Sequence, residues 1–246
     1  RSRVQDLGIF DLLSITTYSL NDLEHSYDGD WGNSELWSQD PYNFDSDIQG
    51  WEYDFFDKTI KNRSTVTEEV RIYRDLSNKS SVIVGSYVKF LSETDDASGY
   101  LFAGDASKYD GSFDINNIAG YMQYEQKLNH RFTLSLNTRF ETNQIKYSGE
   151  SNYYGSNDTT IALGTEDVLA GFRLALQYNI YANAMMYGSI SRGYKAGGIN
   201  QNPYLAPTNR IYKPEYNLNY ETGFKTYTQN MQSQLTLFYM NREEQQ

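Results

Sequence analysis

The sequence predicts an all-β protein whose strands form an antiparallel meander, part of a transmembrane β-barrel. Apolar and polar residues alternate with a period of two over stretches of about 11 to 15 residues, longer than the ~5–6 residues usual in globular sheets. Short turns alternate with long polar segments. Tyrosine occurs 23 times in 246 residues, although the mean hydropathy is -0.70. Tyrosine is favoured where one end of a side chain is apolar and the other is wet, as at a membrane interface.

The alternation is clearest in 131–141, where even positions are apolar or Thr and odd positions are polar or charged. The segments 68–73 and 170–178 repeat it. No comparably long stretch keeps a helical period, and no run of about 18 apolar residues occurs that would predict a membrane-spanning helix. Alternating strands are the way in which a β-barrel crosses a bilayer.

In chain order, nine strands are expected, over 9–22, 64–74, 80–92, 115–127, 131–146, 166–178, 183–195, 215–226 and 231–243. The short connections are 75–80, 128–131, 178–183 and 227–230. Long loops are expected near 26–60, 94–113, 147–165 and 197–213. In transmembrane barrels the short turns are periplasmic and the long loops extracellular. Because single-chain bacterial barrels have an even number of strands, nine strands indicate an incomplete barrel. A soluble antiparallel sandwich or jelly roll is the alternative.

Composition excludes several classes of function. A net charge of -11 argues against a nucleic-acid partner, which needs a basic surface. The chain has no cysteine, and its two histidines, His25 and His130, are far apart in the sequence. We therefore expect no cofactor, no metal site and no catalytic residues, and hence not an enzyme.

The segment SRGYKAGGIN (191–200) contains three glycines and a lysine. It does not match a phosphate-binding loop, because its lysine precedes the paired glycines instead of following them. Our interpretation is that Gly193, Gly197 and Gly198 permit the bend where a strand leaves the membrane.

An ordered set of motifs resembles the barrel of TonB-dependent outer-membrane receptors. Its members are SRGYKAGGIN (191–200), the pattern of Pro214, Glu215, Tyr220, Glu221, Gly223 and Lys225, and FYMNREEQQ (238–246). TEEVRIY (67–73) and ITTYS (15–19) are similar to strands of the same family. The set touches most of the chain and is strongest after residue 166.

The resemblance implies a barrel of about 22 strands in the outer membrane of a Gram-negative bacterium, plugged by an N-terminal domain. It also implies uptake of a scarce nutrient, a ferric siderophore by family default or else cobalamin or a carbohydrate, driven by the TonB complex through the plug. We expect residues 1–246 to be a partial barrel without the plug, a fragment of the receptor. The other partners are outer-membrane lipid, lipopolysaccharide and the small nutrient.

The segment 26–60 contains all three tryptophans and nine acids against one cation. Trp31, Trp37, Trp51 and Tyr53 are candidate ligand contacts, with aromatic faces for stacking beside carboxylates that accept hydrogen bonds. This chemistry suits a sugar, a cobalamin-like or a cationic ligand better than an anionic ferric siderophore, which favours Arg clusters. The alternatives are an aromatic girdle with a solvated acidic loop, or carboxylates binding divalent ions that bridge lipopolysaccharide.

A second candidate group is Arg192, Tyr194 and Lys195, which would hold a substrate or a loop at the outer rim. Seven charged residues are expected to face the lumen and to contact the plug or water: Glu69, Arg71, Arg139, Glu141, Arg173, Glu221 and Lys225. Two other functional classes stay open. One is a structural or adhesive outer-membrane barrel, and the other is a secreted β-rich carbohydrate-binding or hydrolytic domain.

Overall fold

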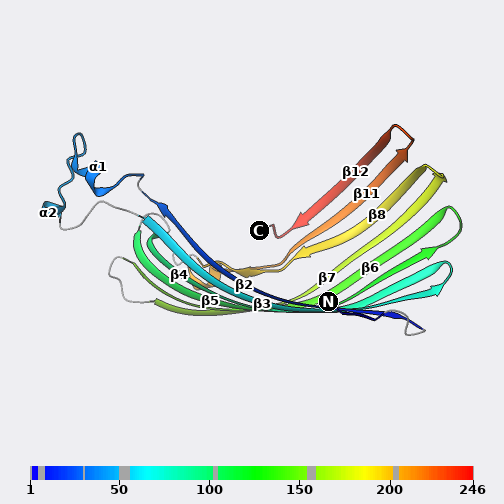
Figure 1. Cartoon of the computed structure of the whole chain (residues 1–246), viewed down its shortest axis with the longest axis horizontal. Coiled ribbons are helices and arrows are strands. Elements are labelled where there is room, and N and C mark those ends of the chain that lie inside the picture. Colours follow the sequence, from blue (N-terminus) through cyan, green and yellow to red (C-terminus); the bar gives the residue numbers. More distant parts are fainter. Residues whose placement is uncertain are drawn as a thin grey trace.

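The computed structural model describes residues 2–4, 9–29, 31–49, 56–101, 105–153, 159–201 and 205–245. Its main feature is one antiparallel sheet of ten strands, in the order β1-β2-β3-β4-β5-β6-β7-β8-β11-β12 (Figure 1). The long strands are β2 (Asp11–Asp28), β3 (Phe56–Ser77), β4 (Ser80–Leu101), β5 (Asp105–Lys127), β6 (Phe132–Tyr153), β7 (Thr159–Tyr181), β8 (Ala184–Lys195), β11 (Glu215–Tyr227) and β12 (Gln232–Glu243). The short elements are β1 (Ser2–Val4), β9 (Gly198–Ile199), β10 (Ile211–Tyr212), the helices α1 (Ser34–Ser38) and α2 (Ser46–Gln49), and the 3-10 helix η1 (Pro207–Asn209).

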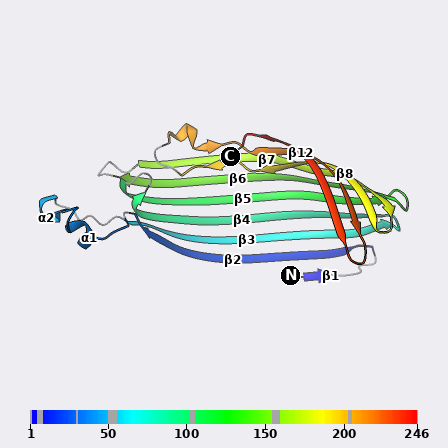
Figure 2. The same ribbon diagram turned by 90° about the horizontal axis from the view of Figure 1, so that it is seen from above.

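The nine long strands are the nine that the alternation predicts, and the antiparallel meander is confirmed. Short connections join β3 to β4, β5 to β6, β7 to β8 and β11 to β12 at one end of the sheet, which we call the turn end (Figure 2). The opposite end, where α1 and α2 lie, is the loop end (Figures 1 and 2). Among the described residues, none of the helices has the length and apolar character needed to cross a membrane.

Strands β2 to β7 are longer than predicted, and two expected loops are wrong. Most of 94–113 belongs to β4 and β5, which pair from Ser80 and Gln126 up to Leu101 and Asp105. Most of 147–165 likewise belongs to β6 and β7. The polar composition of these segments suggested loops, but ladder hydrogen bonds join backbone groups and tolerate polar side chains on both faces.

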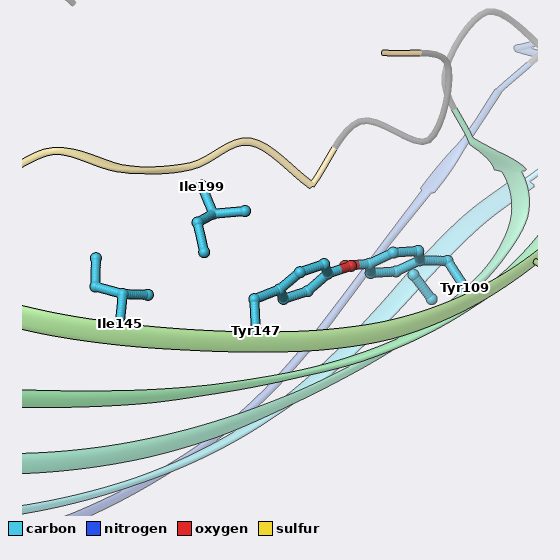
Figure 3. Packing of buried hydrophobic residues seen from close by; sticks show 5 residues of the cluster. Tyr109, Ile145, Tyr147 and Ile199 are labelled. Carbon is cyan, nitrogen blue, oxygen red and sulfur yellow. The ribbon is translucent and has the colours of Figure 1, made fainter. Parts of the chain in front are cut away.

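A strap lies across one face of the sheet. It consists of residues 196–201 and 205–213, and within it β9 pairs with β10. Figures 1 and 3 show it on the concave side of the sheet, which we call the inner face. The segment was expected to be an outward loop, but it folds back over the strands.

The outer face has an apolar band on the half of the strands next to the turn end. On β6 the outward, even-numbered positions over 132–142 are Phe, Leu or Thr, whereas those over 144–150 are polar. On β7 the band covers 168–178 and is followed by Glu166. Its side chains are exposed, with Phe140 at 64%. A band of about 9–11 residues per strand matches the length that a tilted strand needs to cross a bilayer.

The buried core lies on the other half of the strands and on the inner face. It is formed by Ala97, Tyr109, Ile145, Tyr147 and Ile199 (Figure 3). Ile199 comes from the strap and the other four come from β4, β5 and β6. Packed against them are Phe113, Ile115, Ile161 and Leu163. The strap therefore covers what would otherwise be apolar surface exposed to water.

Candidate functional site

The inner face of the turn-side half is hollowed and charged. A hollow of about 470 Å³ lies across β3 to β7, and its charged and aromatic lining includes Glu69, Arg71, Tyr121, Arg139 and Arg173. We call it the inner hollow. The ladder brings these residues together, because Tyr121 pairs with Arg139 and Arg139 pairs with Gly171.

On one side of the inner hollow a tyrosine, a glutamate and an arginine form a hydrogen-bonded group. Tyr121 Oη donates to Glu69 Oε1 at 2.6 Å. Arg71 donates to both oxygens of Glu69, from Nε at 2.9 Å and from Nη2 at 2.8 Å. The ring of Tyr121 lies over Gly85 on β4, where a Cβ would overlap it. The glycine therefore gives the ring the space to lie flat on the sheet.

A second group of the same kind links the hollow to the end of β8. Arg139 donates to Glu141 Oε2 from Nε at 2.9 Å and from Nη2 at 2.7 Å. Tyr194 Oη donates to the same oxygen at 3.1 Å and accepts from Arg139 Nε at 3.2 Å. The Tyr194 ring lies close over Gly171, and the Arg139 guanidinium lies 5.5 Å from the centre of the Tyr87 ring.

A third group lies on β8 and β11. Tyr187 Oη donates to Glu221 Oε1 at 2.8 Å, and Lys225 Nζ lies 5.3 Å from the centre of the Tyr187 ring. A Cβ at Gly223 would overlap this ring. Tyr187, Glu221 and Lys225 line a second hollow of about 240 Å³, and Arg173 lines both hollows.

Among the three arginines of the inner hollow, two form ion pairs and the third does not, within the described residues. Glu69 and Glu141 satisfy Arg71 and Arg139. Arg173 is exposed and, within the part of the chain that the structure describes, has no ion-pair partner. A guanidinium with free donors binds carboxylates, phenolates and phosphates in a two-point geometry. The inner face therefore offers an anion-binding position at Arg173.

Beside the strap, the loop-side half of β3 and β4 is ionic. Lys61 Nζ lies 3.0 Å from Asp95 Oδ2 and 3.9 Å from Glu93 Oε1, and Arg63 pairs with Glu93. Asp95 and Glu93 are buried. The strap adds Gln201 Nε2, which donates to Asp95 Oδ2 at 2.8 Å. Buried carboxylates are tolerated when they are paired with a cation or hydrogen-bonded, because an unpaired buried charge is costly.

Two aromatic hydroxyls meet in the core under the strap, beyond the apolar band of the outer face. Tyr109 and Tyr147 share a hydrogen bond between their hydroxyl oxygens. Burial raises the pKa of both phenols above the usual value for tyrosine. Both groups therefore stay neutral at physiological pH.

The glycines of SRGYKAGGIN have a more specific role than a membrane bend. A Cβ at Gly197 would overlap the carbonyl oxygen of Tyr212, and one at Gly198 would overlap the Tyr212 ring. Both are buried, because β10 packs against this part of the strap. Gly193 has open space around its Cβ position. The paired glycines thus permit a close approach between the two arms of the strap.

The structure does not bring Arg192, Tyr194 and Lys195 together as one site. Arg192 donates from Nη1 to the Ala170 carbonyl oxygen at 3.1 Å and lies 4.0 Å from the centre of the Tyr216 ring. Tyr194 turns to the inner hollow. Lys195 is exposed at the end of β8.

The tryptophan segment lies at the loop end of β2, away from the inner hollow (Figure 1). Trp31 is 90% exposed. Trp37 in α1 packs edge-on against Tyr42, with ring centres 4.7 Å apart, and lies against Gly32. Trp51 and Tyr53 lie outside the described residues. Of the predicted ligand contacts in this segment, Trp31 presents its ring to solvent, whereas Trp37 contributes to local packing.

The seven charged residues expected on the polar face do lie on the inner face, in or beside the two hollows. The sequence analysis missed the tyrosines that accompany them, Tyr121 and Tyr187, because it assigned tyrosine to the membrane interface. Two features of the sequence and the strand pairing could have identified these tyrosines. Each has the parity of the neighbouring charged residues, and each pairs in the ladder with a glycine, Gly85 or Gly223.

Comparisons with known proteins agree with this fold. Residues 3–246 match a family model described as TonB dependent receptor-like, beta-barrel. Among solved structures, the chain is similar to the ferric yersiniabactin uptake receptor FyuA from Yersinia pestis, with a TM-score of 0.79 and 16% identity, over 99% of this chain and 34% of that one. It is also similar to the ferric-catecholate import receptor Fiu from E. coli K12, with a TM-score of 0.66 and 14% identity, over 98% and 39%.

A third similar structure is the copper transporter OprC, with a TM-score of 0.68 and 12% identity, over 96% of this chain and 37% of that one. A search of curated protein sequences finds no match. At these identities the solved structures show the fold. The chain spans between a third and two fifths of the length of each of these three proteins.

Proposed function

The chain belongs to the TonB-dependent receptor-like β-barrel family, and we propose that it forms part of an outer-membrane receptor that takes up a scarce nutrient by TonB-energised, gated transport. The apolar outer band would face outer-membrane lipid, with lipopolysaccharide around its loop-end edge. The inner face would line the lumen, and the loop end would face the medium. The plug domain that contacts the TonB complex would fill the lumen beside the two hollows.

The substrate that the inner face supports best is an anionic metal chelate of the ferric siderophore type. The observation that carries this is the placement of Arg71, Arg139 and Arg173 in one hollow, with Arg173 unpaired among the described residues. Such donors suit the carboxylate or catecholate groups of a chelate. FyuA and Fiu, which are named for ferric chelates, support the same choice.

A second candidate substrate is neutral or cationic, a cobalamin or a carbohydrate. It is favoured by the acidic, aromatic segment at the loop end, where Trp31, Trp37, Trp51 and Tyr53 would capture the ligand first. Arg192 and Lys195 would then act at the rim. In this alternative the arginines of the inner hollow contact the plug and not the substrate.

The test measures ligand binding to the complete receptor in detergent, with the change in tryptophan fluorescence as the readout. The panel contains a ferric tricatecholate, a ferric carboxylate chelate, cobalamin and a maltooligosaccharide. We expect a ferric chelate to bind, and Arg173→Glu to weaken it by about ten- to a hundredfold, because a charge-assisted hydrogen bond is replaced by repulsion. The control is Arg131→Glu, in the exposed turn between β5 and β6. Binding of cobalamin or the oligosaccharide that is insensitive to Arg173→Glu would replace the chelate with the second candidate.

A further inference from the structure

The strap is fixed to the inner wall by polar and apolar contacts. The Gly197 amide N–H donates to Asp167 Oδ2 at 3.0 Å, and Gln201 Nε2 donates to Asp95 Oδ2 at 2.8 Å. Ile199, between them, is 7% exposed and belongs to the core. The two arms hold each other, since the Asn200 N–H donates to the Arg210 carbonyl oxygen at 2.7 Å. The described residues of both arms thus lie on the wall together.

The wall at the strap also holds buried polar atoms for which the described residues provide no hydrogen-bond partner. They are Oδ1 of Asp95, Oδ1 of Asn117 and Nδ2 of Asn143, in side chains that are at most 7% exposed. Asn143 pairs in the ladder with Asp167, which receives the strap's Gly197. A buried polar atom without a partner opposes the state that buries it. Lifting the strap would let water reach this wall, so the covered state is stabilised by Ile199 and opposed by these atoms.

The end of β8 that leads into the strap, which we call the strap root and which contains Tyr194, is joined to the inner hollow. The ladder between β7 and β8 ends at Phe172 and Arg192, so the backbone of Tyr194 pairs with Tyr216 of β11 but not with β7. The Tyr194 hydroxyl is held by Arg139 and Glu141. Glu141 also accepts from Asn117 Nδ2 at 2.9 Å. One carboxylate therefore connects the arginine of the hollow, the root of the strap and the wall beneath it.

We propose that the strap is a hinged cover whose hinge, Tyr194, is coupled to the occupancy of the inner hollow. A carboxylate that binds Arg139 competes with Glu141 for the guanidinium. The group that holds Tyr194 then loosens, and the strap lifts from the wall. The coupling is reciprocal, so the inner hollow binds the carboxylate more tightly when Ile199→Ala weakens the strap. Tyr194 is a positioning residue here, acting on the strap through Glu141.

Hydrogen–deuterium exchange of the complete receptor in detergent tests this, with peptides that cover 196–201 and 205–213. Tyr194→Phe removes one hydrogen bond to a carboxylate and is expected to raise amide exchange in the strap about tenfold. The matched control is Tyr187→Phe, since Tyr187 donates to Glu221 in the same way and also lies over a glycine. It leaves strap exchange unchanged because it does not touch the strap root.

The second measurement uses citrate as the probe, compared with sodium chloride at the same ionic strength. Citrate is expected to raise strap exchange in the wild type and to have no further effect in Tyr194→Phe. Unchanged strap exchange in Tyr194→Phe, or an equal rise in Tyr187→Phe, would remove Tyr194 as the hinge. A citrate effect that persists in Tyr194→Phe, or no citrate effect in the wild type, would break the coupling to the hollow.

Discussion

The two halves of the long strands use the same alternation but place their apolar side chains on opposite faces. In the turn-side half of β6, Phe140 and its even-numbered neighbours point outward, and the inner positions carry charges such as Arg139. In the loop-side half, the apolar residues Ile145 and Tyr147 point inward, and outward positions such as Lys146 are polar. The phase of the pattern changes once, without a break in the strand.

The phase of the pattern in each half is set by what that half faces. In the turn-side half the proposed lipid takes the apolar face, and water or another domain meets the polar face. Beyond the apolar band a single-layer sheet has water on both sides, unless part of the chain covers it. The strap supplies that cover over β5–β7 with Ile199, whereas Lys61 and Asp95 form ion pairs over β3 and β4.

The largest expected effect comes from removing the inward core of the loop-side half. Ile145→Ala leaves a cavity under the strap and is expected to lower the free energy of unfolding by about 2–5 kcal/mol. Urea unfolding of the complete protein in detergent micelles measures it. Lys146→Ala, one residue along on the opposite face, should stay within about 0.5 kcal/mol of the wild type. Equal costs for the two variants would contradict a core on the inner face.

A charged substitution in the turn-side half tests whether the apolar band of the outer face meets lipid. Phe140→Lys places an ammonium in the proposed lipid-facing band and is expected to cost about 2–4 kcal/mol in liposomes. Ser148→Lys, on the same face of β6 but beyond the band, should cost less than about 0.5 kcal/mol. The measurement is unfolding of liposome-inserted protein by guanidinium. If both lysines are tolerated, the band does not meet lipid.

Two glycines test the packing on the inner face of the turn-side half, because one lies under a tyrosine ring and the other has open space. Gly85→Ala must displace the ring of Tyr121 and is expected to lower the free energy of unfolding by about 1–3 kcal/mol. Gly120→Ala has open space and should be neutral within about 0.5 kcal/mol. Denaturant unfolding of both variants in micelles compares them. A neutral Gly85→Ala would show that the ring of Tyr121 does not need the glycine.

The smallest effect concerns pH and the loop-side core. Burial raises the pKa of Tyr109 and Tyr147, so above pH ~10 the unfolded chain loses these protons while the folded chain keeps them. Between the pKa of each phenol in the unfolded chain and its higher pKa in the folded chain, the free energy of unfolding should fall by about 1.4 kcal/mol per pH unit. Below pH ~10 neither phenol makes the free energy of unfolding depend on pH. In Tyr147→Phe the fall should be shallower, whereas the exposed Tyr181→Phe should keep the wild-type slope. Unfolding titrations in micelles at several alkaline pH values decide this, and equal slopes in all three proteins would place Tyr147 in water.

Much of the sheet follows from local sequence. Strand number and the short turns were predictable because a period of two and a turn involve residues close together in the chain. The charged set of the inner face followed from the same parity. The strand ends were not predictable from polarity, since β4 and β5 continue through polar residues by backbone pairing alone.

The site shows the same division. The sequence by itself determined the alternation, and with it the strands and the face that carries Arg139 and Glu141. Only the tertiary structure decided that Tyr194 reaches Glu141, 53 positions away in the chain, and that Ile199 folds inward over Ile145. The physical reason is that side-chain alternation is a local property. The covering of a face, and the partner of a buried hydroxyl, depend on which distant segments arrive beside it.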